Sequence, residues 1–487
     1  MKFAKYMMPV LVIVAMPESN SKGGKRMSTV WTNRVLVFLS LVVSLAILAA
    51  CAAPPPAAPV VQTKVVEQTK VVEVQKVVTA TPAQVSTKAP QPISLRFTIW
   101  SSNEKHLAML NGFAQAYKAT HPNVSVQFDT IPFADYSTKL AVQLAGSNPP
   151  DVGWMPESLA VPFLEAGAFA DLGTRVKNDA QYDIADLSKP AMSLYLKGDS
   201  IFGIPFSTSP HFIIYNIDLF AKAGIDTPDK LYARDEWTWD NLAKSAKTIK
   251  DKTGVYGFQS VSAGIYKEYL TQSLAEFTRA WGGDIWDADG KTCLLNKPES
   301  VASLQWYHNM VFKDKSAVPP GEEVDFFSGG AAIRPGYLSE ISRLEKATFK
   351  WGVIRLPKGP GGWASVIGQS SIVAFRAGRN VEAATDFVAF VTNKENSKTM
   401  AEFFPSIRKS VLEAPEFLKA NPLVPTDMMK DHVVPSIANG RLLPTHSNFE
   451  KIRLAITPVF DTMWVANANV QASMDKACDA MKPLLNK

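Results

Sequence analysis

Residues 93–128 switch between two hydrophobic periodicities, and this switch constrains the fold more than any other feature of the chain. Apolar side chains occupy alternate positions in 93–99 and again in 124–128, as expected for strands. Between them, apolar residues recur at helical spacing from Leu107 to Tyr117, and the His-Pro-Asn turn that follows ends the helix. A strand, a helix and a strand within about 36 residues form a βαβ unit, which predicts a parallel sheet.

The same alternation continues along the chain. A short helix is expected at 136–145, a Gly- and Pro-rich break follows at 146–150, and 151–154 is expected to be the next strand. Further on, Thr238 can cap a helix that ends before Gly254. Alternating strands and helices predict an α/β protein, and 487 residues suit two domains better than one.

The N-terminal segment has the parts of a secretion signal. Arg34 precedes an uncharged run at 35–50, and this run ends in small residues before Cys51. The four residues that end at Cys51 resemble a bacterial lipobox, in which the cysteine receives diacylglycerol and becomes the new N-terminus. An uncleaved anchor is the alternative, because Val35–Ala53 is just long enough to span a bilayer. Both alternatives place the rest of the chain outside the cytoplasm, at the cell surface or in the periplasm.

We expect residues 1–50 to be the signal peptide, with Met27 as the true start, since the residues from Met27 onward would form a compact signal peptide by themselves. Residues 51–92 are rich in Ala, Pro and paired Val, include a six-residue near-repeat at 63–78, and lack aromatic residues. They are expected to form an extended tether between the lipid on Cys51 and the folded domain. A short β-ribbon is the alternative, because Val-Val pairs favour strands.

Charge and cysteine usage limit the function further. Most of the net charge of +6 lies in the leader, and the residues after position 50 carry 45 basic and 44 acidic side chains, so no nucleic-acid partner is expected. Only Cys293 and Cys478 follow Cys51. A disulfide between them fits an oxidising compartment, and two buried thiols are the alternative. No zinc-binding Cys/His spacing, Gly-x-Ser-x-Gly elbow or His-Glu-x-x-His motif occurs, so no metal, cofactor or enzymatic activity is expected.

Six segments carry a resemblance to a known family. They are the Leu-Arg-Phe-Thr-Ile-Trp strand at 95–100, the 144–152 segment that ends in Pro-Pro-Asp-Val, 203–206 with 214–216, 237–242, 329–333 with 336–337, and 404–408. In this order they resemble the extracellular solute-binding proteins of the maltose-binding type, family 1 of the ABC importers, and the similarity covers nearly all of 93–487. The resemblance implies an α/β, two-lobe, periplasmic-binding-protein-like fold (type II) with a hinge and an interlobe ligand cleft. It also implies that a sugar or oligosaccharide is bound and delivered to ABC transporter permease subunits.

Chain order assigns 93–205 and 335–367 to the first lobe, and 207–333 and 371–487 to the second. Three segments are expected to cross between the lobes, at 205–209, 334–335 and 368–371. The protein is expected to be a monomer, held to the membrane by the lipid on Cys51.

A sugar site needs aromatic rings for stacking, and amides or carboxylates that bond to hydroxyl groups. Such residues follow strands or lie at the expected crossings, and open α/β sheets bind ligands at the carboxyl ends of strands. The ligand-binding candidates are Trp100, Ser102, Asn103, Trp154, Glu157, Ser209, His211, Trp281, Gly336, Tyr337, Gln369 and Arg408. Further candidates are Arg334, Trp363, Ser370, Phe403 and Phe404, whereas Asp151 is expected to have a structural role.

Structural alternatives stay open for two of these candidates. His211 can be a satisfied residue beside an apolar strand, and Trp281 can pack over the Gly-Gly turn that follows it. The alternative functions are an extracellular hydrolase, a surface adhesin or sensor partner, and a binder of solutes other than sugars. A phosphate or sulfate ligand would need clustered Arg or a Gly-rich helix start, and a polyamine would need several acids beside the aromatic rings. The Trp and amide content therefore favours a sugar.

Overall fold

The computed structural model describes residues 91–260 and 266–486. The signal peptide, the lipidation site and the tether lie outside the described residues, so the fold does not test the predictions made for them. Within the described ranges, no helix is both long enough and apolar enough to cross a membrane.

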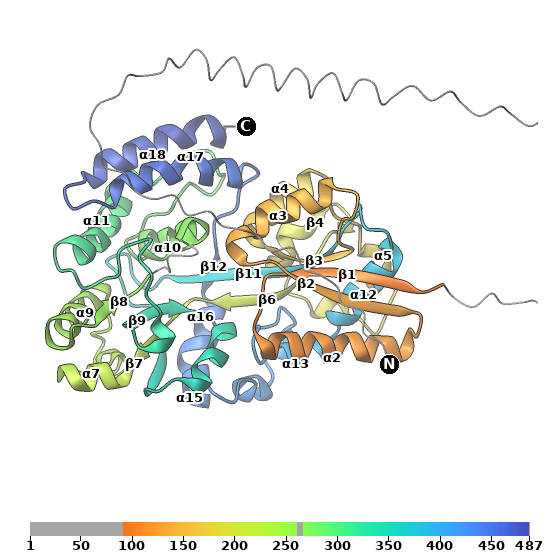
Figure 1. The fold of residues 1–487 in the computed structure, drawn as a ribbon, viewed down its shortest axis with the longest axis horizontal. Coiled ribbons are helices and arrows are strands. Elements are labelled where there is room, and N and C mark those ends of the chain that lie inside the picture. The colour runs from red at the N-terminus through yellow and green to blue at the C-terminus, as the bar shows by residue number, and fades with distance from the viewer. Residues whose placement is uncertain (1–90, 261–265, 487) are drawn as a thin grey trace, which may run out of the picture. The chain divides into compact units, whose positions relative to one another are not determined.

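The first lobe is built on a sheet of strand order β12-β11-β3-β1-β2 (Figure 1). β6 also belongs to this sheet and pairs with the edge of β11 that lies opposite β3. Its strands are β1 (Ile93–Ile99), β2 (Val124–Thr130), β3 (Val152–Pro156), β6 (Ile204–Pro210), β11 (Ser365–Ala374) and β12 (Gly440–Leu442). β1 lies parallel to both β2 and β3, which confirms the predicted βαβ unit and parallel sheet. β11 runs antiparallel to β3 and to β6.

The second lobe is built on a smaller sheet of order β10-β7-β9-β8. Its strands are β7 (Phe212–Asn216), β8 (Tyr256–Phe258), β9 (Ala331–Gly336) and β10 (Trp351–Arg355). β7 is antiparallel to β9 and β10, and β8 is parallel to β9. A separate hairpin joins β4 (Leu196–Lys197) to β5 (Ser200–Ile201).

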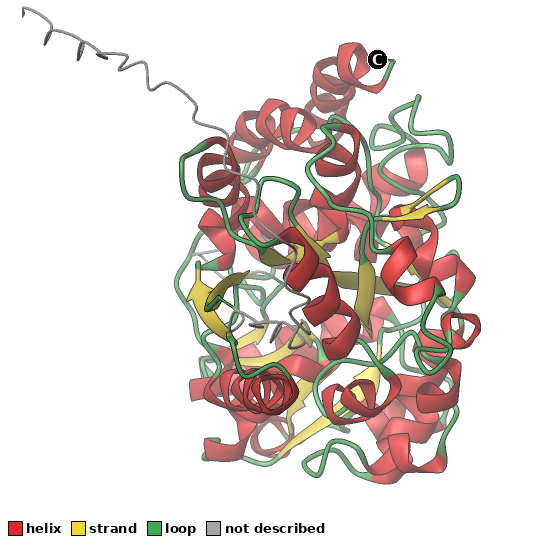
Figure 2. Ribbon diagram, turned by 90° about the vertical axis from the view of Figure 1, so that its right-hand side faces the viewer, coloured by secondary structure: helices red, strands yellow, loops and turns green. Residues whose placement is uncertain are grey.

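Helices cover both sheets, and Figure 2 shows the strands in the interior between them. Around the first sheet lie α2 (Glu104–Thr120), α3 (Phe133–Ala145), α4 (Glu157–Glu165), α5 (Gly173–Lys177), α6 (Lys189–Met192), α12 (Val381–Val391) and α13 (Lys394–Met400). The later and middle parts of the chain supply α7 (Ile217–Ala223), α8 (Pro228–Ala233), α9 (Trp239–Thr253), α10 (Tyr266–Ala280), α11 (Pro298–Phe312), the 3-10 helix η5 (Leu338–Lys346), α14 (Lys409–Leu412), α15 (Thr426–Met428), α16 (Val434–Ala438), α17 (Phe449–Met463) and α18 (Val470–Leu485).

Local sequence explains where several of these helices begin and end. The Asn103 side chain accepts hydrogen bonds from the first turn of α2. Thr238 accepts one from the backbone N–H of Asn241, as predicted, and α9 ends at Gly254, whose φ of +77° suits glycine. These caps satisfy backbone groups that a helix end leaves unpaired.

Residues in strand β7 show how the second sheet buries both of its faces. Ile213 and Tyr215 pack with α9, α10, α11, α17 and α18, whereas Phe212 and Ile214 pack with η5 and the chain after α13. Because successive side chains in a strand point to opposite faces, one continuous apolar run supplies two cores.

The expected lobe boundaries differ from the structure in three segments. η5 was expected in the first lobe, but its apolar side chains pack against Phe212 and Ile214 of β7 in the second. Residues 351–355 were expected in the first lobe, but they form β10 and pair with β7 in the second sheet, where Val353 and Ile354 each fill one of its two cores. Conversely, α12 and α13 were expected in the second lobe. They pack on the first sheet instead, because apolar side chains of α12 such as Phe387 lie against Phe97 of β1.

Of the three expected crossings, the structure supports two. β6 leads from the first sheet directly into β7 of the second, and β11 runs from Val366, which packs in a core of the second lobe, to Ile372, which packs in the core of the first. Residues 334–335 do not cross, because they pair with β7 inside the second sheet. Instead, the chain crosses between the lobes near residue 408, since Ile407 packs in the first lobe and Val411 in the second.

Cys293 and Cys478 form a disulfide, with their Cα atoms 5.3 Å apart. The bond ties the loop before α11 to the last helix of the chain. The disulfide is therefore confirmed over the alternative of two free thiols, and it agrees with an oxidising compartment.

Candidate functional site: a cavity at the crossing strands

A small cavity of about 100 Å³ lies where the crossing strands leave the first sheet. It is lined by Trp100, Phe133, Pro156, Glu157, Ser207, Ser209, Tyr337, Ser339, Gly368, Gln369, Ser370 and Phe404. Trp100 directly follows β1, and Pro156 ends β3, so the cavity opens at the carboxyl ends of these strands. η5 of the second lobe contributes Ser339, which means that both lobes supply the walls.

Aromatic rings form one wall of this cavity. The Trp100 ring lies edge-on to Phe133 and to Trp154, with centroid distances of 5.6 and 5.0 Å. Trp154 itself is 1% exposed and packs between Phe206 and Phe404, so it supports the wall from behind. Trp100 is only half-buried and has a surface that a ligand can cover.

Glu157 is the carboxylic acid of the site. It stands at the first position of α4, is buried, and accepts a 2.9 Å hydrogen bond from the backbone N–H of Gln369 on β11. Burial raises the pKa of Glu157 to about 7, although hydrogen bonds from its own backbone N–H and from that of Gln369 favour the charged form. Near neutral pH the side chain therefore exists in both protonation states.

Polar groups of the paired crossing strands form the floor. Ser207 and Ser209 lie on the same side of β6, and their hydroxyl oxygens are 2.9 Å apart. On β11, Gly368 pairs with Ser209. The Gln369 side chain donates from Nε2 to the carbonyl of Ala191, which leaves its buried Oε1 without a partner.

A buried acid–base pair adjoins this floor. Nδ1 of His211 contacts Oε1 of Glu276, a residue of α10, and both residues are 3% exposed. The imidazole also packs edge-to-face on the Tyr337 ring, at a centroid distance of 4.4 Å. Nε2 of His211 and Oε2 of Glu276 have no hydrogen-bond partner.

The two lobes also touch at the rim of the cavity. Asn103, beside Trp100, donates from Nδ2 to the hydroxyl of Ser342 on η5 at 2.8 Å. Lys105 of α2 forms a 2.8 Å ion pair with Glu345, also on η5. The start of α2 therefore faces η5 across the boundary between the lobes.

The structure brings five of the twelve predicted site residues together in the cavity wall: Trp100, Glu157, Ser209, Tyr337 and Gln369. His211 lies directly beside them, and Asn103 lies at the rim. Ser102 is exposed and does not line the cavity.

Four predicted site residues are placed elsewhere or behind the wall. Trp154 belongs to the core of the first lobe, and Trp281 packs on Trp306 in the second. At Gly336, a Cβ would come within 2.6 Å of Ile214, so this glycine serves close packing in β9. Arg408 does not line the cavity either.

Arg408 is 1% exposed and acts as a structural tie. Its guanidinium donates to the backbone carbonyls of Thr392 and Asp183 and lies 3.5 Å from the carboxylate of Asp186. All of these groups belong to the first lobe's helices and loops. The side chain is thus fully used in holding segments together.

Several cavity residues were missed by the sequence reasoning. Ser207 alternates with Ser209 along the same strand, so strand periodicity would have found it. Phe133 begins the helix after β2, and the carboxyl-end rule would have drawn attention to it. Ser339 and Gly368 carry no pattern that marks them.

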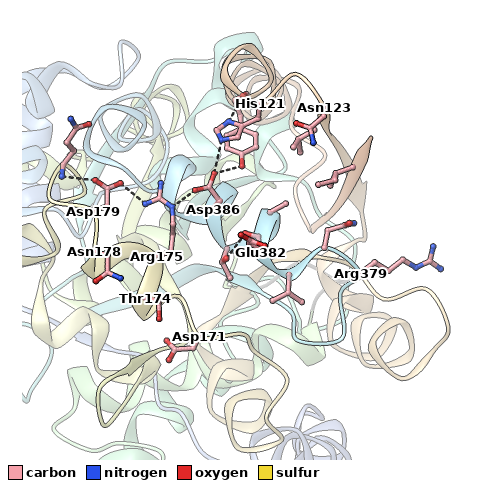
Figure 3. Close-up of a pocket in the computed structure, with 18 of the residues that line it drawn as sticks. His121, Asn123, Asp171, Thr174, Arg175, Asn178, Asp179, Arg379, Glu382 and Asp386 are labelled. Atoms are coloured by element: carbon pink, nitrogen blue, oxygen red, sulfur yellow. Dashed lines mark hydrogen bonds and ion pairs between the residues drawn. The ribbon is translucent and has the colours of Figure 1, made fainter. Parts of the chain in front are cut away.

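A larger depression of about 1120 Å³ lies on the first lobe alone, beside the amino ends of β1 and β2 (Figure 3). There Asp386 accepts hydrogen bonds from the Tyr117 hydroxyl and from Arg175, and its third neighbour is His121. The pKa of Asp386 is lowered, because these donors outweigh the effect of desolvation. Arg175 is also paired with Asp179, so the charges satisfy one another and give a structural network rather than a solute site.

Two α/β lobes joined by crossing strands, with an aromatic and polar cavity at the crossing, define a binding protein that holds a ligand between its lobes. The chain matches the family of bacterial extracellular solute-binding proteins over residues 101–398 and belongs to it. Members of this family are binding proteins rather than enzymes.

Known proteins of this kind resemble the chain over most of its length. The arabinooligosaccharide-binding protein of Bacillus subtilis is 24% identical, over 66% of this chain and 76% of that protein. The maltotriose-binding protein of Pyrococcus abyssi is 25% identical, over 68% and 70%. Among solved structures, an ABC substrate-binding protein of Listeria monocytogenes in complex with cycloalternan has a TM-score of 0.71 at 23% identity, covering 82% of this chain and 100% of that one.

Proposed function

We propose that this protein binds a sugar or oligosaccharide in the interlobe cavity and delivers it to the permease of an ABC importer. The observation that carries the proposal is the meeting, in one cavity, of the aromatic wall at Trp100 with the carboxyl group of Glu157 and the side chains of Ser209 and Gln369. Two relatives are named for the oligosaccharides that they bind, which supports the same ligand class.

The chemistry of the cavity suits a neutral, hydroxylated ligand. An aromatic ring offers a flat face to the C–H groups of a sugar, and the ring wall here is completed by Phe133 and Phe404. Hydroxyl, amide and carboxyl groups can bond to the sugar's hydroxyls. None of the described residues that line the cavity is Lys or Arg, so a phosphorylated ligand would find no cation to neutralise it.

We propose further that the exported protein is held at the outer face of the cell membrane by lipid on Cys51 and acts as a monomer. The lipobox-like sequence that ends at Cys51 supports the anchor. The disulfide between Cys293 and Cys478 supports exposure to an oxidising compartment. Mass spectrometry of the mature N-terminal peptide would reveal a diacylglyceryl cysteine, and an unmodified Cys51 would contradict the anchor.

Thermal unfolding of the purified protein with a panel of solutes tests the binding proposal. Mono- and oligosaccharides are compared with amino acids, polyamines and glycerol phosphates. A ligand at about 100 times its Kd should stabilise the folded protein by about 2.7 kcal/mol, which is a readily visible shift in Tm. A shift with amino acids, polyamines or glycerol phosphate alone would support a solute-binding role but refute the proposal that the ligand is a sugar.

Two tryptophan variants then locate the site. Trp100→Ala should weaken binding of the sugar found in the panel by about 1–3 kcal/mol, because a stacking surface is removed. Trp363→Ala is the matched control, since Trp363 is 37% exposed and does not line the cavity. Equal affinities of Trp100→Ala and the unaltered protein would refute this placement of the site.

A further inference from the structure

Three buried polar atoms without partners belong to residues that line or adjoin the proposed sugar site. They are Nε2 of His211, Oε2 of Glu276 and Oε1 of Gln369, on residues that are 3%, 3% and 1% exposed. Gln369 is part of the cavity wall, and His211 packs against Tyr337, which is also part of it. Buried polar atoms are normally paired, so atoms left unpaired at a binding cavity are sites where a ligand can supply the missing bond.

The proton on His211 can be placed from its contacts. The nitrogen that faces the Glu276 carboxylate is Nδ1, and in the tautomer that suits this contact Nδ1 carries the hydrogen and donates it to Oε1. Nε2 is then a hydrogen-bond acceptor. Oε2 of Glu276 and Oε1 of Gln369 are acceptors as well, because the Gln369 amide nitrogen already donates to Ala191. The unpaired atoms therefore all require a donor from the ligand.

Gly368 leaves the space through which a ligand group can reach Nε2. Gly368 lines the cavity, and a Cβ placed on it would lie 3.3 Å from Cε1 of Tyr337 and 3.7 Å from Nε2 of His211. A methyl group there would occupy the room between the imidazole and the cavity. Its backbone does not have a positive φ, so alanine is compatible with the local conformation.

We propose that His211, held in its acceptor tautomer by the positioning residue Glu276, is a specificity-determining contact that accepts a hydrogen bond from a ligand hydroxyl. Together with Gln369 it selects solutes rich in O–H donors. It disfavours anions such as phosphate esters, because phosphate oxygens accept hydrogen bonds and cannot donate one to Nε2 of His211 or Oε1 of Gln369. The proposal rests on the sugar-binding function proposed above and names the residues that enforce it.

Titration calorimetry with maltotriose, arabinotriose and glycerol 3-phosphate tests the proposal on the purified protein. Glu276→Gln should weaken binding of the sugar by about tenfold or more, because the glutamine amide can donate to Nδ1 and shift the imidazole proton to Nε2. Gly368→Ala should weaken it similarly by filling the approach to Nε2. Glu299→Gln, an exposed substitution on α11, is the control and should bind as the unaltered protein does.

NMR chemical shifts of the histidine ring nitrogens distinguish a ligand contact from a purely structural role, because only a ligand contact changes the His211 shifts when sugar is added. Comparison with His211→Gln assigns the His211 signal. The expected result is a protonated Nδ1 and a bare Nε2 whose resonance shifts when the sugar is added, and an inverted tautomer in Glu276→Gln. If Glu276→Gln does not fold, Gly368→Ala and the His211 resonance decide.

The outcomes separate the two proposals. If the unaltered protein binds a sugar and its His211 resonance does not respond, or if both variants bind with unchanged affinity, the role of His211 is refuted while sugar binding stands. If the unaltered protein binds glycerol 3-phosphate and no sugar, or if no sugar of the thermal unfolding panel shifts its Tm, the proposed function fails and the inference falls with it.

Discussion

The buried carboxyl group of Glu157 makes the stability of this protein depend on pH in a defined direction. Burial raises its pKa from 4.5 to about 7. Below pH 4.5 the group is protonated in both the folded and the unfolded chain. Between pH 4.5 and 7 only the folded chain keeps the proton, so the free energy of unfolding falls as pH rises through this window. A shift of this size corresponds to about 3 kcal/mol in total, and the loss is complete above pH 7.

Urea unfolding at a series of pH values, followed by tryptophan fluorescence, measures this effect. Glu157→Gln keeps a similar shape and cannot ionise, so the difference in stability between the two proteins isolates this one group. The variant should gain about 3 kcal/mol relative to the unaltered protein between pH 4.5 and 8. Glu299→Gln removes an exposed carboxyl group and should show almost no such gain. A difference for Glu157→Gln that stays constant across the series would refute the argument from burial.

Three further substitutions test the framework around the cavity. Replacing Cys293 and Cys478 by Ser should lower the free energy of unfolding by about 2–4 kcal/mol, and reducing agent should lower the Tm of the unaltered protein but not of this variant. Arg408→Leu should cost about 3–5 kcal/mol in urea unfolding, since Asp186 loses its buried partner, while calorimetry should find sugar affinity unchanged. Trp154→Ala should destabilise the first lobe by about 3–5 kcal/mol in the same unfolding assay, because it empties a core position; unaltered stability would contradict its place in that core.

The fold could be predicted from sequence to the extent that local periodicity determines it. Alternation in 93–99 and 124–128, with a helix between, required a parallel pair, and β1 and β2 form it. Thr238 could be recognised as a cap because capping depends on neighbouring residues. The lobe boundaries were less predictable, because neither the sequence of 351–355 nor that of α12 indicates which of the two sheets the segment joins. Their positions are set by long-range pairing with β7 and β1.

The site shows the same division between local and long-range information. Trp100 and Glu157 follow strands directly, so the rule of carboxyl ends placed them correctly at the cavity. Trp154 looked equivalent but lies within a strand that is buried on both faces, so its ring turned into the core. Glu276 lies in the middle of a helix remote in sequence from His211, and only the folded chain brings the two together. Asp151 accepts hydrogen bonds from the backbones of Arg96 and Asn380, in line with the structural role expected for it.

The location of a bound sugar tests the central claim most directly. A crystal structure of the protein soaked or co-crystallised with the oligosaccharide that raises its Tm most would supply it. The account predicts the sugar between the lobes, with one ring against Trp100 and hydroxyl groups within hydrogen-bonding distance of Glu157 and His211. A sugar bound elsewhere, such as in the depression beside Asp386, with the interlobe cavity unchanged, would contradict the account.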